Sequence, residues 1–337
     1  MNKFDYCVYI GRFSPIHLGH AAILSQALKI AKEVVVVIGS CSSPRTIRNP
    51  WMVEERQAMI ESSLSDADKA RVKFIHMKDY LYNNNLWVSV LQEKISTATF
   101  DSENVGLIGF ESDETSFYLK LFPQFTYVEH GTQYNFHATD IRNLYLTGDN
   151  SYKKMVPPGI VPFLTDFQKT EQYSNLKLEK QYLDKYKASW SNSPFEPIFV
   201  TVDALVIKSG HILVVRRGFN PGKGLLCCPG GFVNPREKLE DACLRELKEE
   251  TKINVNIGDL RKSIIESKVF DDPMRSNRGR VISNCFLIDL GVGSLPKVKG
   301  SDDAIEAFWL PLNEYHALEA SFFDDHYHII RSFILRY

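Results

Sequence analysis

Residues 11–20 of the chain read GRFSPIHLGH, and this stretch decides the fold of the first half. It comes directly after the apolar, β-branched run at 6–10, and the apolar positions of an amphipathic helix follow over 19–32. A glycine-rich connection between a buried strand and a helix lets the backbone approach a ligand closely, and the free N–H groups of the helix attract phosphate. The stretch therefore predicts a phosphate-binding turn in which His17 and His20 share one helix face and donate hydrogen bonds to phosphoryl oxygens.

Further apolar runs follow this turn and alternate with helical patterns. They span residues 34–39, 71–77, 104–110 and 125–130. Short apolar runs separated by helices are typical of a parallel sheet buried on both faces. Asn49 and Pro50 predict the N-cap and first position of a helix that continues to Leu64. The first half is therefore predicted to be an α/β domain with a Rossmann-like, doubly wound parallel sheet and with sites where strands lead into helices.

The second half has a different pattern of predicted helices and strands. Residues 171–190 carry an interrupted apolar face that predicts a connecting helix, and prolines follow at 194 and 197. Runs at 199–208 and 211–217, separated by a serine and a glycine, predict a β-hairpin. We therefore expect a first domain at 1–170, a connecting helix at 171–192 and a second domain at 193–337.

Composition limits the classes of protein to consider. The chain has 337 residues, enough for two domains, with 44% apolar residues and 40 basic against 41 acidic side chains. A near-zero net charge gives no footprint for binding a nucleic-acid backbone or an anionic membrane. Six scattered cysteines without metal or redox spacing, no leader-like N-terminus and no long apolar run predict a cytoplasmic protein.

A second motif begins at Gly231, where the sequence reads GFVNPREKLEDACLRELKEETKI. On a helix, Glu246, Glu249 and Glu250 are three or four positions apart, so their carboxylates share one side and repel one another unless divalent cations lie between them. The alternative is an acidic face that is merely solvated. The preceding Pro229-Gly230-Gly231 turn favours a metal site, because it lets a main-chain carbonyl join the metal ligands.

The first motif resembles the HxGH signature of a Rossmann-like nucleotidyltransferase superfamily, whose members transfer a nucleoside monophosphate unit from a nucleoside triphosphate and release pyrophosphate. The later phosphate motif of that superfamily corresponds to residues 136–142, of which Thr139 and Arg142 match. The two serines of that motif are missing, which leaves individual phosphate contacts open. A Thr139 cap on a helix whose first turn holds Arg142 would still bind a triphosphate. The resemblance implies catalysis by His17, His20 and Arg142 with Mg²⁺ (or Mn²⁺), and substrate contacts at Gly11, Arg12, Phe13 and Gly19.

Within that superfamily the first half resembles the archaeal-type nicotinamide mononucleotide (NMN) adenylyltransferases. The similarity rests on the segment that begins at Arg48 and on the segment of Asn85 and Trp87. It implies that Arg48 contacts substrate and that Asn85 and Trp87 hold the nicotinamide ring, since an exposed Trp can stack on a cationic pyridinium. The alternative for Trp87 is a core position of an amphipathic helix. Another phosphate acceptor, or cytidylyl transfer, is the alternative for the activity.

The second motif resembles the Nudix hydrolases, which cleave nucleoside diphosphate derivatives and fold as an α/β/α sandwich around a mixed sheet. The matching box positions are Gly231, Glu237, Arg245, Glu246, Leu247, Glu249 and Glu250. Lys252 stands where the family has glycine. The resemblance implies Mg²⁺ or Mn²⁺ at Gly231 and the three glutamates of the helix. It implies a general base at Glu249 or at a carboxylate of the stretch 301–306, within which Glu306 is favoured.

Between the box and the C-terminus lies an arginine-rich loop. Recognition of a terminal ribose phosphate or an adenine by Phe270, Arg275, Arg278 and Arg280 is one interpretation, and an ordinary exposed hairpin is the other.

Together the two halves resemble bifunctional NMN adenylyltransferase/Nudix hydrolases over nearly the whole chain. The ligands implied are NMN, ATP, NAD and ADP-ribose, with no nucleic acid and no membrane. A second half that binds ADP-ribose without cleaving it is the alternative from another class, and the complete set of carboxylates favours catalysis. The sequence leaves open whether the chain forms a homo-oligomer.

Overall fold

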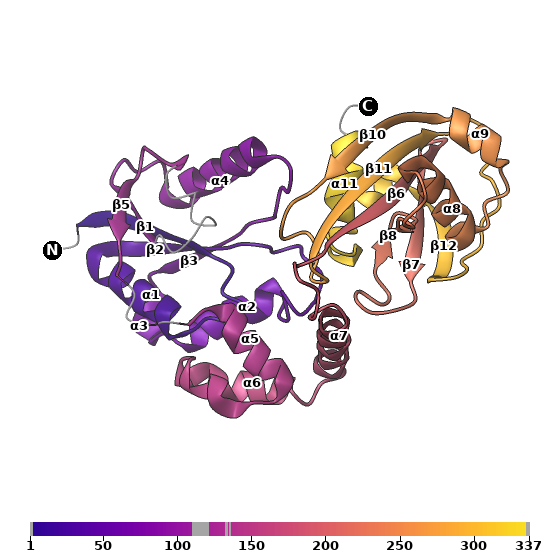
Figure 1. Ribbon diagram of the computed structural model, residues 1–337. Coiled ribbons are helices and arrows are strands. Elements are labelled where there is room, and N and C mark those ends of the chain that lie inside the picture. Colours follow the sequence, from indigo (N-terminus) through magenta and orange to yellow (C-terminus); the bar gives the residue numbers. More distant parts are fainter. Residues whose placement is uncertain (1–2, 110–120, 132–133, 135, 335–337) are drawn as a thin grey trace. The chain divides into compact units, whose positions relative to one another are not determined.

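The computed structural model describes residues 3–109, 121–131, 134 and 136–334. The chain divides into two compact units, Met1–Lys177 and Leu178–Tyr337 (Figure 1). Among the described residues, no helix is long and apolar enough to cross a membrane.

The first unit contains a five-stranded parallel sheet in the order β3-β2-β1-β4-β5. Its strands are β1 (Phe4–Gly11), β2 (Ala31–Ile38), β3 (Val72–His76), β4 (Val105–Gly109) and β5 (Thr126–Glu129). This is the order of a doubly wound sheet, in which the carboxyl ends of β1 and β4 flank the point where the strand order reverses. The predicted fold is confirmed. Phe110, the last residue of one expected strand, lies outside the described residues.

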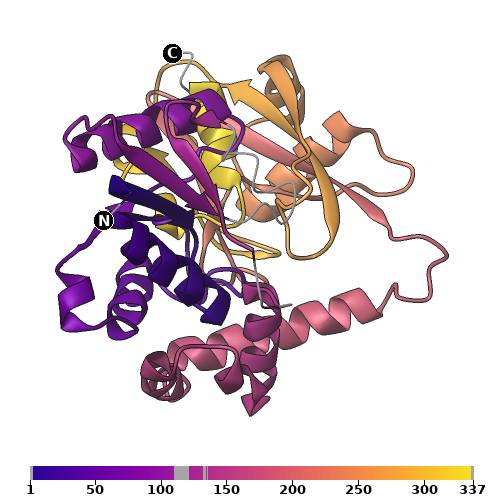
Figure 2. The same ribbon diagram turned by 90° about the vertical axis from the view of Figure 1, so that its left-hand side faces the viewer.

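Helices cover both faces of this sheet, with α4 on one side and α1, α2 and α5 on the other (Figure 1, Figure 2). The helices and 3₁₀ turns of the unit are α1 (Leu18–Ile30), α2 (Val53–Ser62), α3 (Asp66–Lys69), α4 (Asn84–Thr99), α5 (Ala138–Thr147), η2 (Asn150–Lys154), η3 (Pro158–Ile160) and α6 (Val161–Phe167). Alternate residues of β1 pack into different cores: Tyr9 lies in the cluster under α1, and Val8 lies in the cluster under α4. The period-two pattern of side chains in a strand produces this division.

The start of α2 differs from the prediction. Asn49 and Pro50 were expected at its first positions, but the helix begins at Val53 with Met52 as N-cap, whose backbone N–H donates to the Glu55 carboxylate at 2.6 Å. Asn49 instead closes a turn with Thr46. The buried Trp51 occupies the connection, so tertiary packing delays the helix.

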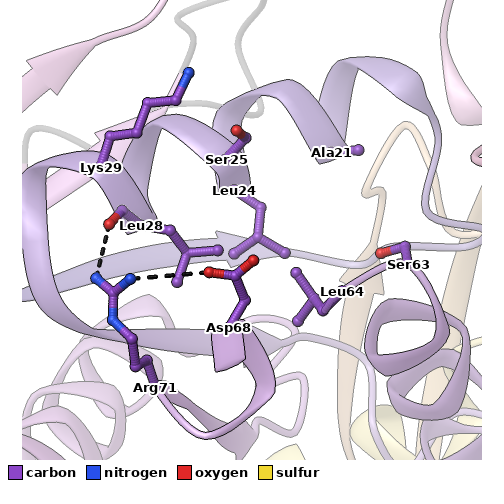
Figure 3. Close-up of a pocket in the computed structure, with 9 residues that line it drawn as sticks. All are labelled: Ala21, Leu24, Ser25, Leu28, Lys29, Ser63, Leu64, Asp68 and Arg71. Carbon is purple, nitrogen blue, oxygen red and sulfur yellow. Dashed lines mark hydrogen bonds and ion pairs between the residues drawn. The ribbon is translucent and has the colours of Figure 1, made fainter. Parts of the chain in front are cut away.

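An arginine caps the C-terminal end of α1. Arg71 donates from one terminal nitrogen to the carbonyls of Leu28 and Ala31, at 2.7 and 2.6 Å, and lies beside Asp68 (Figure 3). The last carbonyls of a helix have no partner within it, so this guanidinium replaces the missing donors. Leu28, Asp68 and Arg71 also line a cavity of about 330 Å³, so the polar groups on that side of the cavity already serve to cap the helix.

The second unit contains a mixed sheet in the order β10-β11-β6-β7-β12, with β8 paired to β7 and β9 to β6. Its strands are β6 (Ile198–Lys208), β7 (His211–Arg217), β8 (Leu226–Cys227), β9 (Gly230–Phe232), β10 (Ile264–Phe270), β11 (Arg280–Asp289) and β12 (Ala304–Pro311). Only β11 and β6 pair in parallel along the main path of the described sheet. The predicted hairpin turns at Ser209 and Gly210, both with positive φ, as a two-residue hairpin connection requires.

Two helices, α8 and α11, lie on opposite faces of this sheet, which confirms the predicted sandwich (Figure 1). The helical elements of the unit that follow β6 are α8 (Leu239–Thr251), α9 (Ile257–Lys262), α10 (Leu312–Tyr315), η4 (Glu319–Ser321) and α11 (His326–Ile334). Lys252, at the position where related sequences have glycine, takes the left-handed conformation with φ of 46° and ends α8. The helix therefore ends in the usual way, but with a non-glycine residue in a conformation that costs it more.

Helix α7 (Glu171–Ala188) spans the division between the two units. Tyr173 and Leu176 belong to the core of the first unit, whereas Tyr186 packs on Phe199 of β6 with ring centroids 5.7 Å apart. The Glu179 carboxylate accepts a hydrogen bond from the backbone N–H of Gly222. We infer that the last part of this helix belongs structurally to the second unit, rather than forming a separate linker over 171–192.

A buried ion pair joins two loops of the second unit. Arg275, between β10 and β11, donates two hydrogen bonds of 2.9 and 2.8 Å to Asp325, which precedes α11, and both side chains are almost completely excluded from solvent. A paired guanidinium and carboxylate tolerate burial because each satisfies the other.

Replacing Asp325 with Ala leaves the Arg275 charge buried and unpaired, so we expect a loss of about 3 to 5 kcal/mol in the free energy of unfolding of the second unit. Urea unfolding followed by circular dichroism measures this loss. Asp271→Ala, which removes an exposed partner of Arg280, is the matched control and should cost less than about 1 kcal/mol. Equal losses for the two variants would contradict a structural role for the buried pair.

Candidate active sites

The two histidines of the first motif cap α1 together. His17 is the N-cap residue, and its Nδ1 accepts from the backbone N–H of His20 at 3.3 Å. The Nδ1 of His20 accepts in return from the backbone N–H of His17 at 3.4 Å, and the two rings stack with centroids 3.6 Å apart. This is a capping box built from two imidazoles instead of a hydroxyl and a carboxylate.

This geometry fixes where the ring protons lie. Burial lowers the pKa of His17 to about 4, with a smaller contribution from His137, and burial lowers the pKa of His20 well below its usual value. Both rings are therefore neutral at pH 7. A neutral ring whose Nδ1 accepts a hydrogen bond carries its proton on Nε2. Each ring thus carries one N–H donor on Nε2. The ring of His20 also forms a hydrogen bond with the backbone of Pro15, so donation by both histidines to a ligand stays a prediction.

Two glycines make room for the rings of this motif. A Cβ on Gly11 would lie 2.9 Å from the Phe13 ring, and a Cβ on Gly19 would lie 3.0 Å from the His17 ring. Phe13 is buried and has a positive φ of 50°. Its ring makes an edge contact with the His20 ring, with ring centroids 5.0 Å apart. Gly11, Phe13 and Gly19 therefore shape the turn.

Arg142 connects the later motif to this turn. It donates to the Ser14 carbonyl at 2.7 Å and to Thr139 Oγ1 at 2.9 Å. Thr139 was expected to cap α5, but the cap residue is His137, whose backbone N–H donates to Asp140. Thr139 lies two positions past the cap, and its hydroxyl accepts a hydrogen bond from the Arg142 guanidinium instead.

Three arginines of the predicted site are close enough to repel one another. Burial, together with the charges of Arg12 and Arg48, lowers the pKa of Arg142 to about 9. A cluster of guanidinium groups beside two imidazole N–H donors is suited to a polyanion such as a triphosphate. The structure therefore brings Arg12, Arg48 and Arg142 together with the histidines.

The buried Arg56 is a positioning residue that the sequence did not single out. Its guanidinium donates to the carbonyls of Arg12, Gly39 and Ser40 at 2.6, 2.8 and 3.0 Å. These carbonyls lie just after β1 and β2, so Arg56 holds the two strand ends together. The sequence could have indicated this role, because Arg56 occupies a position on the buried, apolar side of α2.

Asn85 and Trp87 lie in the first turns of α4, which follows the carboxyl end of β3. Asn85 is exposed, and Trp87 packs with part of its surface against the core on the α4 side of the sheet. Parallel strands present their carboxyl ends at one edge, so these residues and the histidine turn belong to the same edge of the sheet. Trp87 thus has features of both interpretations of the sequence, because one part of its ring packs in the core and another part is accessible.

In the second unit, Arg245 ties the motif together. It makes a bidentate pair with Glu237 at 2.7 and 2.8 Å, and one of its terminal nitrogens donates to Glu246 at 2.7 Å and to Glu249 at 3.0 Å. The hydrogen bonds from Arg245 lower the pKa of Glu237 to about 2. The loop that begins at β9 is thereby fixed against α8. Leu247 on the other side of the helix is fully buried in the core.

Burial disfavours the charged form of the carboxylates beside the glycine turn. Burial raises the pKa of Glu250 to about 8, although its carboxylate accepts from the Gly230 N–H at 3.0 Å, and burial also raises the pKa of Glu246. A Cβ on Gly231 would lie 2.6 Å from the Glu246 carboxyl group, so only glycine lets the backbone come this close.

A divalent cation fits this donor set, since it would offset the charge that burial disfavours. Among the described residues, no three His, Cys, Asp or Glu side chains converge as a metal site. Glu246 and Glu249 instead form ion pairs with Arg245.

The candidates for the general base are placed differently. Glu249 is about half exposed on α8. Glu306 lies on β12, and Arg216 donates to it at 3.0 Å. The charge of Asp302 raises the pKa of Glu246, and that of Asp303 raises the pKa of Glu250. These two aspartates are therefore within electrostatic reach of the box. Sequence reasoning considered this stretch but favoured Glu306 within it.

The arginine-rich loop is only in part a recognition surface. Phe270 is a core residue beside Phe333. Arg275 is committed to Asp325, and Arg280 donates to the Asp271 carbonyl. Arg275 and Arg278 both line a cavity at Gly231, and Arg278 differs in that its guanidinium lies over the rings of Phe232 and Phe323. The prediction of substrate contacts for Phe270 is wrong, because its ring is needed in the core.

The low pKa of His17 predicts how stability depends on pH. Its pKa is about 6.5 in the unfolded chain and about 4 in the folded one, so its contribution to stability is complete above pH 6.5 and is lost as the pH falls toward 4. Between pH 7 and pH 5 the wild type should lose about 1 to 2 kcal/mol more than His17→Asn, which keeps an N-cap acceptor. Urea unfolding at both pH values tests this. The exposed His316→Asn should follow the wild type, and parallel profiles for all three proteins would refute the assignment.

Two family profiles match separate parts of the chain. One, described as Cytidylyltransferase-like, matches residues 8–144, and the other, described as NUDIX domain, matches residues 197–333. Both matches contain the motifs described above.

Relatives and solved structures extend these matches. The chain is 39% identical to a nicotinamide/nicotinic acid mononucleotide adenylyltransferase of Acinetobacter baylyi over 57% of this chain and 99% of that protein. It is 35% identical to an ADP-ribose pyrophosphatase of Methanocaldococcus jannaschii over 49% of this chain and 86% of that protein. A crystal structure of a bifunctional NMN adenylyltransferase/ADP ribose pyrophosphatase from Francisella tularensis, complexed with AMP and a manganese ion, is 36% identical, covers 99% of both chains and has a TM-score of 0.92. The chain therefore belongs to the family of bifunctional NMN adenylyltransferase/ADP-ribose pyrophosphatases.

Proposed function

We propose that the chain performs both reactions of its family: adenylyl transfer from ATP to NMN, which gives NAD and pyrophosphate, and hydrolysis of ADP-ribose to AMP and ribose 5-phosphate. The observation that carries the first assignment is the pair of neutral, reciprocally capped histidines beside three guanidinium groups. The observation that carries the second is the set of buried glutamates next to a side-chain-free glycine turn.

The first reaction needs positioning and charge stabilisation, with no covalent intermediate. The phosphate of NMN attacks the α-phosphorus of ATP in line, and pyrophosphate leaves. The Nε2–H groups of His17 and His20 and the Arg142 guanidinium would donate to the phosphoryl oxygens as charge shifts to the leaving group. Mg²⁺, or Mn²⁺, would supply additional positive charge on the triphosphate when bound.

The acceptor assignment rests on the start of α4. The accessible part of Trp87 would stack on the cationic nicotinamide ring, and Asn85 would hydrogen-bond its amide. Arg48 and Arg12, next to Arg142, would contact phosphate groups of the two substrates. These roles follow from the family and from the position of the residues at the carboxyl edge of the sheet.

In the second reaction, water attacks a phosphorus of the diphosphate. Glu246, Glu249 and Glu250, with the main chain at Gly231, would hold Mg²⁺ or Mn²⁺, which would polarise the diphosphate when bound. The manganese ion in the Francisella tularensis protein is consistent with this choice. Glu249 and Glu306 are the bases that the sequence proposed, and Asp302 joins them because its charge acts on Glu246. We place both reactions in the cytoplasm.

Because each reaction uses its own residues, variants should separate the two activities. His20→Ala should lower NAD synthesis by roughly 100-fold or more, since one charge-stabilising donor is lost, and should leave ADP-ribose hydrolysis within about twofold of wild type. Glu250→Gln should lower hydrolysis by at least about 100-fold and should leave NAD synthesis unchanged within about twofold. Chromatography of the products after separate incubation with NMN plus ATP and with ADP-ribose measures both activities.

The matched control is Glu240→Gln, an exposed glutamate of α8 that pairs with Arg261. It should leave both activities intact. A folded His20 or Glu250 variant that loses both reactions would show that one active site serves both.

Trp87→Ala tests the acceptor. If the ring stacks on nicotinamide, NMN binding should weaken by about 1 to 2 kcal/mol while ATP binding stays nearly constant, and Trp87→Phe should recover part of the loss. Calorimetric titration of each substrate measures the two affinities. A variant that weakens both substrates equally would identify Trp87 as a core residue only.

A further inference from the structure

A small polar cavity lies next to the glycine turn of the second unit. Its lining includes Thr201, Arg217, Gly231, Arg278, Asp324 and His326, and its volume is about 30 Å³. A cavity that holds one water needs roughly 10 to 15 Å³ by this kind of measure, so the space fits one or two oxygen-sized groups and is too small for a nucleobase.

Two neighbouring aspartates of this region have opposite surroundings. Asp325 is saturated by its bidentate pair with Arg275. Asp324 lines the cavity, and no hydrogen bond to its carboxylate is found among the described residues. Burial raises the pKa of Asp324 to about 6, against the attraction of Arg278. Asp324 is half-buried, and a partly desolvated acceptor without donors is unfavourable, so a ligand that brings donors gains more there than at an exposed carboxylate.

The backbone at Asp324 supports a role for the side chain. Its φ is 44°, a left-handed conformation that is rare for a residue other than glycine. Residues held in such conformations cluster at binding sites, where the surrounding structure enforces a particular side-chain direction. The neighbouring Phe323 is buried, and the guanidinium of Arg217 lies 4.2 Å from its ring centroid.

Arg278 also lines the cavity, and its charge acts on Asp324. Its guanidinium carbon lies 5.2 Å from the ring centroid of Phe232 and 5.8 Å from that of Phe323, and its Nε donates to the Ser276 hydroxyl at 3.3 Å. The guanidinium therefore makes cation–π contacts with two aromatic rings. Its remaining N–H groups are directed within its own plane, where they can donate to an oxygen atom of a ligand.

We propose that Asp324 and Arg278 form a hydroxyl-binding subsite that recognises the vicinal diol of a substrate ribose. Asp324 accepts hydrogen bonds from two adjacent hydroxyls, and Arg278 donates to one of their oxygens. The proximity of Gly231 places this subsite next to the diphosphate of the substrate, so the inference rests on the proposed hydrolase function. Both riboses of ADP-ribose carry such a diol, and the experiment distinguishes them.

The test uses the full-length protein with Mg²⁺ and two pairs of competitive inhibitors of ADP-ribose hydrolysis. One pair is ribose 5-phosphate and 2-deoxyribose 5-phosphate, and the other is AMP and 2′-deoxy-AMP. In the wild type, the ribo form of one pair should bind roughly 10-fold more tightly than its deoxy form, the scale of one hydrogen bond to a charged group. The pair that shows this preference identifies which ribose is bound.

Asp324→Asn is the informative variant, because Asn tolerates the left-handed backbone and keeps the size of the side chain while losing the charge and one acceptor. It should reduce the ribo-to-deoxy ratio to below about threefold and change the affinity for the deoxy form little. Asp259→Asn, an exposed aspartate of α9, should keep the wild-type ratio.

No ribo preference in either pair for the wild type, or an unchanged ratio in Asp324→Asn, overturns the proposal. Calorimetric titration of both pairs needs no turnover. A wild type that fails to hydrolyse ADP-ribose would therefore refute the proposed function, while the calorimetric ratios of the two pairs would still decide the subsite.

Discussion

In the first site, Arg142 joins two segments that are far apart in the chain, since it donates to the Ser14 carbonyl and to the Thr139 hydroxyl. The same device recurs at every functional part of the molecule. Arg56 holds the ends of β1 and β2, and Arg245 holds the glycine turn against α8. A guanidinium has five donors in one plane, so a single side chain can fix several acceptors at once. Both sites depend on this constraint, because their ligand-facing groups lie on turns that the strands alone do not hold.

The two sites are electrostatically opposite. In the first unit, burial keeps two histidines neutral and crowds guanidinium groups together, which favours a polyanion. In the second unit, burial raises the pKa of two glutamates, which favours a divalent cation. In each case burial produces a charge arrangement that a ligand of opposite charge would relieve. Such perturbed groups are expected at sites whose ligands carry the compensating charge.

Glycine has the same use in both units. Gly11 and Gly19 make room for the Phe13 and His17 rings, and Gly231 makes room for the Glu246 carboxylate. In all three places a Cβ would approach the neighbouring side chain to about 3 Å or less, so the residue cannot change without moving a functional group. This explains why the two motifs were recognisable in the sequence, because close backbone approach requires glycine at fixed offsets.

The two α/β units and the hairpin turn at Ser209 and Gly210 were predictable from the sequence, because strand periodicity and turn residues are local properties of the chain, whereas the two motif families were identified by resemblance. Sequence reasoning misplaced the start of α2 and the cap of α5, since buried Trp51 and the His137–Asp140 pair outweigh local propensity there. The tertiary structure was needed to show which arginines of the 269–280 segment line a cavity and that Phe270 belongs to the core. It was also needed to show that, among the described residues, no donor to the Asp324 carboxylate is found, in contrast to Asp325. These properties depend on which segments meet in space, and a side chain's partners from distant parts of the chain leave no periodic signal in the sequence.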